Sequence, residues 1–130
     1  MNDAFCMLLR GSRLICMHRN KFFEVEDGLR MDIGAFVAAL EYVADTRATV
    51  LGKPDPSFFN EAVQSLGYPK KRTTMVGDDT DIDIGGGQDF GLIGILVKTG
   101  KYRKSYCDRS QVRPDFTIPS IAELPEQLGL

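Results

Sequence analysis

Short apolar runs alternate with helical stretches along the second part of the chain. The segments 48–51, 73–76 and 92–97 are rich in apolar and β-branched residues and predict strands. Residues 57–66 between them carry apolar side chains at helical spacing, and residues 84–90 predict a second, shorter helix. This order of strands and helices predicts a parallel sheet with crossover helices, which is the three-layer, Rossmann-like α/β class.

Further elements are predicted at the two ends of the chain. A final helix is expected over residues 121–128. Before residue 48, the pattern predicts a helix over 3–10, a strand over 13–17, a charged turn over 24–27 and a helix over 35–44. This first piece is α/β but short, and it contains no motif with recognisable chemistry.

Two of the predicted strands end in polar turns with candidate chemistry. Gly52-Lys53-Pro54 follows the first strand and Gly77-Asp78-Asp79 follows the second. Active sites of parallel sheets lie beyond the carboxyl ends of the strands, so we expect Lys53 to reach the acidic turn from the neighbouring strand. A lysine in that position is a point charge that can hold a phosphate oxygen.

Four carboxylates crowd the acidic turn, namely Asp78, Asp79, Asp81 and Asp83. Like charges this close destabilise a loop unless a cation neutralises them. Hard oxygen ligands on a tight turn suit Mg²⁺, which takes one or two protein carboxylates and fills its coordination with water and phosphate. An acidic cluster alone is more often a solvated loop, but the glycine turn and the nearby lysine favour a Mg²⁺-dependent phosphoryl-transfer site.

Other motifs fail on particular residues. An EF-hand loop that starts at Asp79 needs Gly where Ile84 stands and Glu where Phe90 stands. The glycines at 85, 86, 87 and 91 resemble a dinucleotide-binding fingerprint, but its third glycine would have to stand where Phe90 is. Gly100-Lys101 lacks the hydroxyl residue and the first glycine of a Walker A loop. A response-regulator receiver is excluded because its lysine follows the acidic residues, whereas Lys53 precedes them.

Composition narrows the class without changing this site. The chain has 130 residues, which suits a single domain, with 43% hydrophobic and 26% charged residues. A net charge of −2 gives no electrostatic case for nucleic-acid binding. No window approaches the roughly 18 apolar residues of a membrane span. The three cysteines, at no metal-like spacing, predict free thiols in a reducing compartment, the cytoplasm.

The order of these motifs resembles the haloacid dehalogenase (HAD) superfamily. Gly52-Lys53-Pro54, followed about 25 residues later by Gly77-Asp78-Asp79-x-x-x-Asp83-Ile84-x-Gly86, is similar to its motifs three and four. Further segments match its subfamily IIA, which includes NagD-like phosphatases and phospholysine phosphohistidine inorganic pyrophosphate phosphatase. These segments are Asp27-Gly28-Leu29, Pro56-x-Phe58-Phe59 and Val97-Lys98-Thr99-Gly100-Lys101-Tyr102. The resemblance runs over residues 2–128.

The resemblance implies a role for each matching residue. Lys53 would be the motif-three lysine that stabilises the nucleophile and the bound phosphoryl group, so it is a catalytic and a substrate-binding candidate. Asp78 would be the motif-four Mg²⁺ ligand, and Asp83 a second acidic position that acts directly or through a metal-bound water. Asp79 occupies a position often filled by Asn, so its role as a ligand stays open. The implied substrate is a small phosphorylated molecule.

One part of the family pattern has no counterpart. Enzymes of this family use an aspartate nucleophile in a D-x-D motif near the N-terminus, and no D-x-D precedes Lys53. We therefore expect residues 1–47 to be the C-terminal part of a cap domain and residues 48–130 to be the C-terminal half of a HAD core. Such a half would hold Mg²⁺ weakly and would have no phosphatase activity alone.

Two interpretations of the whole chain stay open. The first is an enzyme fragment that lacks its nucleophile, through truncation, a gene-model error or a natural short isoform. The second is a non-catalytic interaction or regulatory module built on half a HAD fold. An exposed sheet edge or the cap remnant could join copies into a homo-oligomer, and a stable oligomer would favour the second interpretation. The basic run Lys98, Lys101, Arg103 and Lys104 either borders an anionic substrate or forms a solvated loop, and the sequence favours the loop.

Overall fold

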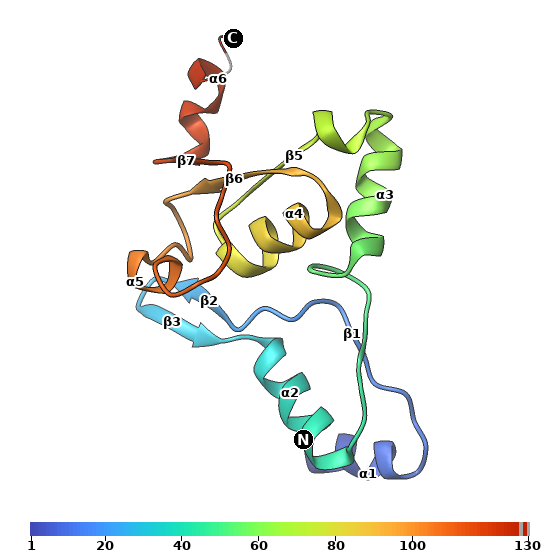
Figure 1. Ribbon diagram of the computed structural model, residues 1–130. Helices are drawn as coiled ribbons and strands as arrows, with labels where there is room; N and C mark the ends of the chain where they lie inside the picture. The colour runs from blue at the N-terminus through green and yellow to red at the C-terminus, as the bar shows by residue number, and fades with distance from the viewer. Residues whose placement is uncertain (128, 130) are drawn as a thin grey trace.

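Three parallel strands form the largest sheet in the computed structural model, which describes residues 1–127 and 129. They are β5 (Thr74–Gly77), β6 (Ile93–Val97) and β7 (Phe116–Ile118), in the order β5-β6-β7. Pairing aligns Val76 with Ile95, and Ile95 with Phe116. The central strand β6 is a continuous apolar run because both of its faces are covered, as parallel sheets require. The predicted parallel α/β class is confirmed (Figure 1).

Helical segments cover both faces of this sheet. On one face Ile95, Val97 and Ile118 form a buried cluster, against which Leu124 packs from α6 (Leu124–Gln127). The other face carries the π-helical turn η2 (Thr80–Gly85) and α4 (Gly86–Phe90). A Cβ added to Gly94 on β6 would lie 2.7 Å from Ile84 Cγ2, so η2 packs directly on the strand. These are the three layers that the sequence predicts.

Helix α3 (Pro56–Leu66) covers the outer side of α4 (Figure 1). It begins at Asp55, whose side chain accepts a hydrogen bond from the Ser57 amide, and it ends at Gly67 in the left-handed conformation. Phe59 is the contact residue: it is 1% exposed and stacks on Phe90 of α4, with ring centroids 6.0 Å apart. The helix predicted over residues 57–66 is therefore confirmed.

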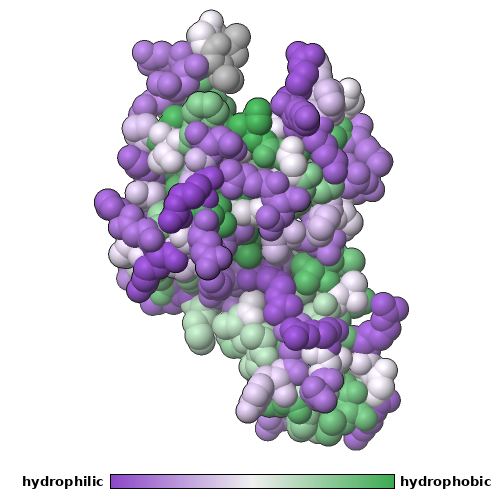
Figure 2. Space-filling view, viewed as in Figure 1, coloured by the Kyte–Doolittle hydropathy of each residue, from purple (hydrophilic) through white to green (hydrophobic). Residues whose placement is uncertain are grey.

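The first part of the chain forms the lower lobe in Figure 1. Its elements are α1 (Asn2–Leu9), β1 (Ile15–Cys16), the hairpin strands β2 (Phe22–Val25) and β3 (Gly28–Met31), and α2 (Ile33–Ala44). Only Cys16, Val37 and Leu40 are buried apolar residues here, and α1 buries none. Figure 2 shows apolar side chains gathered on the surface of this lobe, and Met7, Leu9 and Val43 are among the exposed ones.

Strand β4 (Thr49–Val50) departs from the prediction. It pairs in parallel with β1, as a separate two-stranded sheet, and not with β5 of the large sheet. The expected neighbouring-strand position of Lys53 was therefore wrong. A two-residue strand shows β character in sequence but carries no pattern that selects its partner. Because β1 precedes residue 47 and β4 follows it, their pairing crosses the domain boundary that was placed there. That boundary stays a prediction.

Other elements were missed or differ in detail. The charged turn predicted over residues 24–27 is the end of the β2–β3 hairpin, and neither α5 (Lys104–Cys107) nor β7 was expected. The final helix predicted over 121–128 is a 3₁₀ turn, η3 (Ile121–Glu123), followed by α6, and Leu128 lies outside the described residues. A second 3₁₀ turn, η1 (Lys70–Arg72), precedes β5. Among the described residues, no helix has the length and apolar character needed to cross a membrane.

Candidate functional site

The acidic turn begins where β5 ends. Asp79 Oδ1 accepts hydrogen bonds from the amides of Asp81 and Ile82, at 3.2 and 3.0 Å, and so caps the π-helical turn η2. Gly77 is required here because an added Cβ would lie 2.5 Å from Asp83 Cβ. The turn therefore folds the side chain of Asp83 back over the end of the strand. Single π-helical turns of this kind are frequent at functional sites.

Lys53 reaches this turn although its strand belongs to another sheet. Its Nζ lies 2.7 Å from Asp83 Oδ1, and the second oxygen of Asp83 accepts from the Asp79 amide at 3.3 Å. The Asp83 side chain is 7% exposed and that of Lys53 is 30% exposed. The predicted meeting of Lys53 with the acidic cluster is thus found, and the Lys53 side chain stays partly exposed.

A second lysine, Lys101, holds the turn from the loop after β6. Its Nζ lies 2.7 Å from Asp79 Oδ2, and its backbone amide donates to Asp78 Oδ2 at 2.7 Å. Both charged side chains of the Lys101–Asp79 pair are largely buried. The sequence favoured a solvated loop for this basic run. That prediction is wrong for Lys101, because its ammonium forms an ion pair with the largely buried carboxylate of Asp79.

These contacts change the charge argument made from sequence. The carboxylates of Asp79 and Asp83 are each paired with a lysine, so their charges do not by themselves call for an added cation. Within the described part of the chain, Asp78 Oδ1 is the one oxygen of Asp78, Asp79 and Asp83 that receives no protein donor. No group of three or more His, Cys, Asp or Glu side chains in residues 1–127 and 129 is arranged to hold a metal ion.

Asp81 points away from the other three carboxylates and is fully engaged elsewhere. Ser110 Oγ lies 2.7 Å from its Oδ1, while Tyr106 Oη and Lys21 Nζ lie 2.5 and 3.2 Å from its Oδ2. Burial opposes ionisation of Asp81, but these three hydrogen bonds outweigh it and lower the pKa of the carboxyl. Burial, and then the bond to Asp81, raise the pKa of Tyr106. Asp81 therefore serves the packing of Lys21 and α5 against η2.

The open space at the turn is small. A cavity of about 10 Å³ is lined by eight residues, among them Asp78, Asp79, Lys101 and the aromatic rings of Phe22, Tyr102 and Tyr106. This volume holds about one water-sized sphere. This cavity is too small for a phosphorylated substrate, and the Asp78 oxygen that lacks a protein donor is of the type that Mg²⁺ prefers.

The family model described as HAD-hydrolase-like matches residues 50–124, which is more than half of the chain and includes every residue of the acidic turn. The chain belongs to the haloacid dehalogenase (HAD) superfamily. Its relatives place it in subfamily IIA, as the resemblance implied.

Curated HAD relatives match nearly the whole chain. Human haloacid dehalogenase-like hydrolase domain-containing protein 2 is 48% identical over 114 residues, which cover 88% of this chain and 43% of that protein. Human phospholysine phosphohistidine inorganic pyrophosphate phosphatase is 35% identical over 130 residues, which cover 98% of this chain and 48% of that protein. The chain thus spans about half the length of the curated relatives it matches.

Solved HAD structures agree with the fold. The p-nitrophenyl phosphatase from Archaeoglobus fulgidus superposes with a TM-score of 0.81 and 30% identity, over 97% of this chain and 50% of that one. The 4-nitrophenylphosphatase from Thermotoga maritima gives a TM-score of 0.82 and 29% identity, over 96% and 48%. The half-length coverage recurs in both comparisons.

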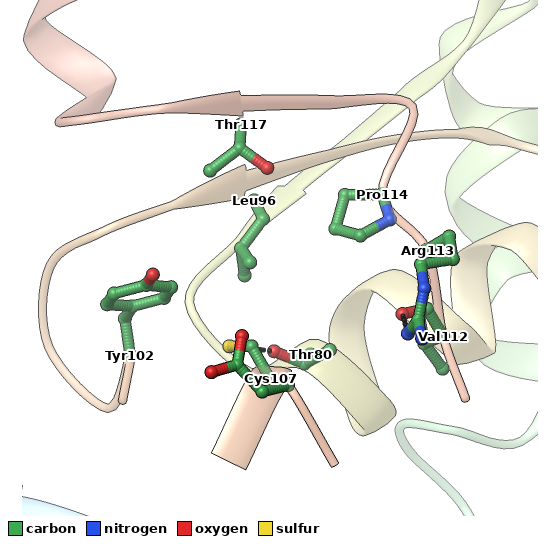
Figure 3. A pocket seen from close by; sticks show the side chains of 9 residues that line it. Thr80, Leu96, Tyr102, Cys107, Val112, Arg113, Pro114 and Thr117 are labelled. Carbon is green, nitrogen blue, oxygen red and sulfur yellow. Dashed lines mark hydrogen bonds between the residues drawn. The ribbon is translucent and has the colours of Figure 1, made fainter. Parts of the chain in front are cut away.

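A larger pocket lies behind the HAD acidic turn, between β6, β7 and α5 (Figure 3). Its volume is about 320 Å³, and Thr80, Leu96, Tyr102, Cys107 and Thr117 are among its lining residues. Thr80 Oγ1 lies 3.0 Å from Cys107 Sγ on one wall of this pocket. None of the three carboxylates with implied roles lines it, although Thr80 and Tyr102 line both this pocket and the small cavity at the turn.

Sequence reasoning missed Lys101, Lys21 and Tyr106 as parts of the HAD site region. The Lys98–Tyr102 segment was noticed as a family feature, but nothing in its spacing shows that Lys101 folds back onto Asp79. Lys21 and Tyr106 come from a hairpin and a helix that the pattern did not predict as such. The free thiols expected of the three cysteines are observed.

Proposed function

We propose that this chain carries the metal-binding and phosphate-binding half of a Mg²⁺-dependent HAD phosphohydrolase that acts on a small phosphorylated substrate. The observation that carries the proposal is the pairing of two groups on one turn. Asp78 keeps one carboxylate oxygen without a protein donor among the described residues, and the side chain of Lys53, which is 30% exposed, ends beside the same turn. The subfamily IIA relatives, which include named phosphatases, support the same chemistry.

The residues divide the work as follows in this proposal. Asp78 would hold Mg²⁺, which when bound supplies positive charge to a transferring phosphoryl group. Lys53 binds a phosphate oxygen as a point charge, and Asp83 orients Lys53 through their 2.7 Å ion pair. Both oxygens of Asp83 already accept hydrogen bonds, which favours contact with the metal through water. Asp79 acts as a cap of η2 and a partner of Lys101, not as a ligand.

A phosphate-binding measurement tests the role of Lys53. Inorganic phosphate is titrated into the chain by calorimetry in the presence of Mg²⁺, and Lys53→Met is expected to weaken binding by about tenfold because the charge is lost. Lys71→Met changes an exposed lysine before β5 and serves as the matched control. Equal phosphate binding by wild type and Lys53→Met would remove Lys53 from the proposal.

The chain alone should not turn over substrate. No D-x-D motif precedes Lys53 to supply the family nucleophile, so Mg²⁺-dependent hydrolysis of p-nitrophenyl phosphate is expected to stay at background. Turnover that disappears in Asp78→Asn would show a complete site and contradict the half-site proposal.

The cytoplasm remains the proposed location, on the basis of the three thiols.

The second candidate is a non-catalytic interaction or regulatory module. One observation favours it: β5 pairs only with β6 within the described residues, so one edge of the large sheet is open for another strand. Light scattering after size-exclusion chromatography distinguishes the two. A stable homo-oligomer that Thr74→Lys dissociates supports the module, because a charge at an edge strand opposes pairing. A monomer supports the half-enzyme.

A further inference from the structure

Lys101 binds the acidic turn in two ways at once. The side-chain ammonium lies 2.7 Å from Asp79 Oδ2 and the backbone amide lies 2.7 Å from Asp78 Oδ2. The exposed fractions of the Lys101 and Asp79 side chains are 13% and 12%, lower for the lysine than the 30% of Lys53. Lys101 is thus the more deeply placed of the two cations at the site.

The backbone around Lys101 is shaped for this contact. Gly100 adopts a left-handed conformation with φ of 54°, and an added Cβ would collide with Asp78 Oδ2. The Tyr102 amide donates to Thr99 O at 3.1 Å and closes a turn that contains Gly100 and Lys101. The peptide after Gly100 is pressed onto Asp78, and the lysine that follows extends to the adjacent carboxylate of Asp79.

We propose that Lys101 is a positioning residue that takes the place of a divalent cation on Asp79. It keeps the turn folded when no metal is present, and it restricts metal binding to Asp78. This inference rests on the proposed function, in which Asp78 holds Mg²⁺.

The physical reason is competition for one carboxylate. Asp79 Oδ1 is occupied by two backbone amides, so Oδ2 is its only oxygen open to a cation, and Lys101 holds it. The Lys101 ammonium on the adjacent Asp79 also repels a divalent cation at Asp78, most strongly where the surroundings are buried. The wild-type turn therefore binds Mg²⁺ more weakly than its carboxylates alone would.

Calorimetric titration of the full chain with MgCl₂ tests the inference through binding and not through activity. Lys101→Met is expected to bind Mg²⁺ about tenfold more tightly than wild type, since a repelling charge is removed and Asp79 is released. Lys101→Arg keeps the charge and is expected to bind like wild type. Lys98→Met removes an exposed lysine from the same segment and is the matched control.

If Lys101→Met does not fold, a double variant provides a second binding test. Asp79→Asn combined with Lys101→Met removes both charges of the pair, so its Mg²⁺ affinity should return close to that of wild type. A gain that persists in the double variant would overturn the inference, because Lys101 would not act through Asp79.

The outcomes separate this inference from the proposed function. Mg²⁺ binding of equal or lower affinity in Lys101→Met than in wild type overturns the inference alone. Binding only after Lys101→Met supports the competition of Lys101 with the metal, but it overturns the proposed role of Asp78 as a Mg²⁺ ligand in the wild-type chain. Absence of Mg²⁺ binding from every variant overturns both the inference and the metal part of the proposed function.

Discussion

The two parts of the molecule are stabilised by different interactions. The sheet β5-β6-β7 is surrounded by buried aliphatic and aromatic residues, including Phe59, Ile84 and Leu96, each at most 2% exposed. The lower lobe has few such residues, and an ion pair links two of its segments. Arg19 binds both oxygens of Glu41 at 2.9 and 2.7 Å, and the Ala48 amide donates to Glu41 Oε1 at 2.9 Å. Apolar burial is non-directional, whereas such a pair depends on geometry.

The contrast explains where the candidate site lies. The acidic turn is attached to the apolar side, with η2 packed on β6, so its carboxylates are held by a rigid base. The hairpin of the lower lobe reaches the same region through polar and aromatic contacts. Lys21 binds Asp81, Glu24 binds Arg103, and Phe22 packs edge-on against Tyr106. The site is therefore built on the part with the larger apolar core and bordered by the part with the smaller one.

The largest effect on stability is expected from removing a buried side chain near the sheet β5-β6-β7. Phe59→Ala should lower the free energy of unfolding by about 3–5 kcal/mol, because it leaves a cavity between α3 and α4. Urea denaturation measures this change. Phe58→Ala is the matched control, since Phe58 is 39% exposed and should cost about 1 kcal/mol or less. Equal losses in the two variants would contradict the apolar account of this side.

A smaller, pH-dependent effect is expected in the lower lobe. The hydrogen bonds from Arg19, and then that from the Ala48 amide, lower the pKa of Glu41. A lowered folded-state pKa gives stability that is present above the unfolded pKa of about 4.3 and is lost as the pH falls through the folded value. Glu41→Gln should therefore cost about 2 kcal/mol at pH 7.

Thermal unfolding as a function of pH checks this prediction. The difference in stability between wild type and Glu41→Gln should shrink below about pH 4.3 as Glu41 itself becomes neutral. Glu61→Gln, at an exposed position on α3, should show little difference at any pH. A Glu41→Gln effect that is constant from pH 7 to low pH would mean that packing, not charge, is what the side chain provides.

The smallest effect is expected where the two parts meet. Tyr106→Phe removes the hydroxyl that lies between Lys21 and Asp81, which should cost about 1 kcal/mol and loosen the hairpin. Hydrogen exchange at β2 and β3 amides should become faster, while that at β6 stays unchanged. Tyr102→Phe, whose hydroxyl has no hydrogen bond to the described residues, is the control. Unchanged exchange in the hairpin would show that other contacts hold it.

The sequence predicted the elements of the apolar part better than those of the polar part. In the apolar part, β6 and α3 followed from a continuous apolar run and from helical spacing with Pro56 and Gly67 at the ends. In the polar part the hairpin was missed, because Glu24 and Asp27 give it the composition of a turn. The partner of β4 could not be predicted, since two residues carry no register information.

The candidate site divides in a similar way. The meeting of Lys53 with the acidic turn was predicted from the placement of strand ends, and it occurs, although by a different route from the one expected. The role of Lys101 was not predicted, because it depends on the left-handed Gly100 and on a loop that folds back over β5 and η2. Local sequence shows which groups can react, whereas the return of a loop is set by tertiary packing.

The central claim is that Asp78 is the one carboxylate of the lysine-neutralised turn that is open to a divalent cation. Calorimetric titration of the wild-type chain with MgCl₂, beside Asp78→Asn, tests it most directly. Asp89→Asn, an exposed aspartate on α4, controls for the change in net charge. We predict weak binding to wild type and Asp89→Asn and none to Asp78→Asn. Equal Mg²⁺ affinity in wild type and Asp78→Asn would contradict the account.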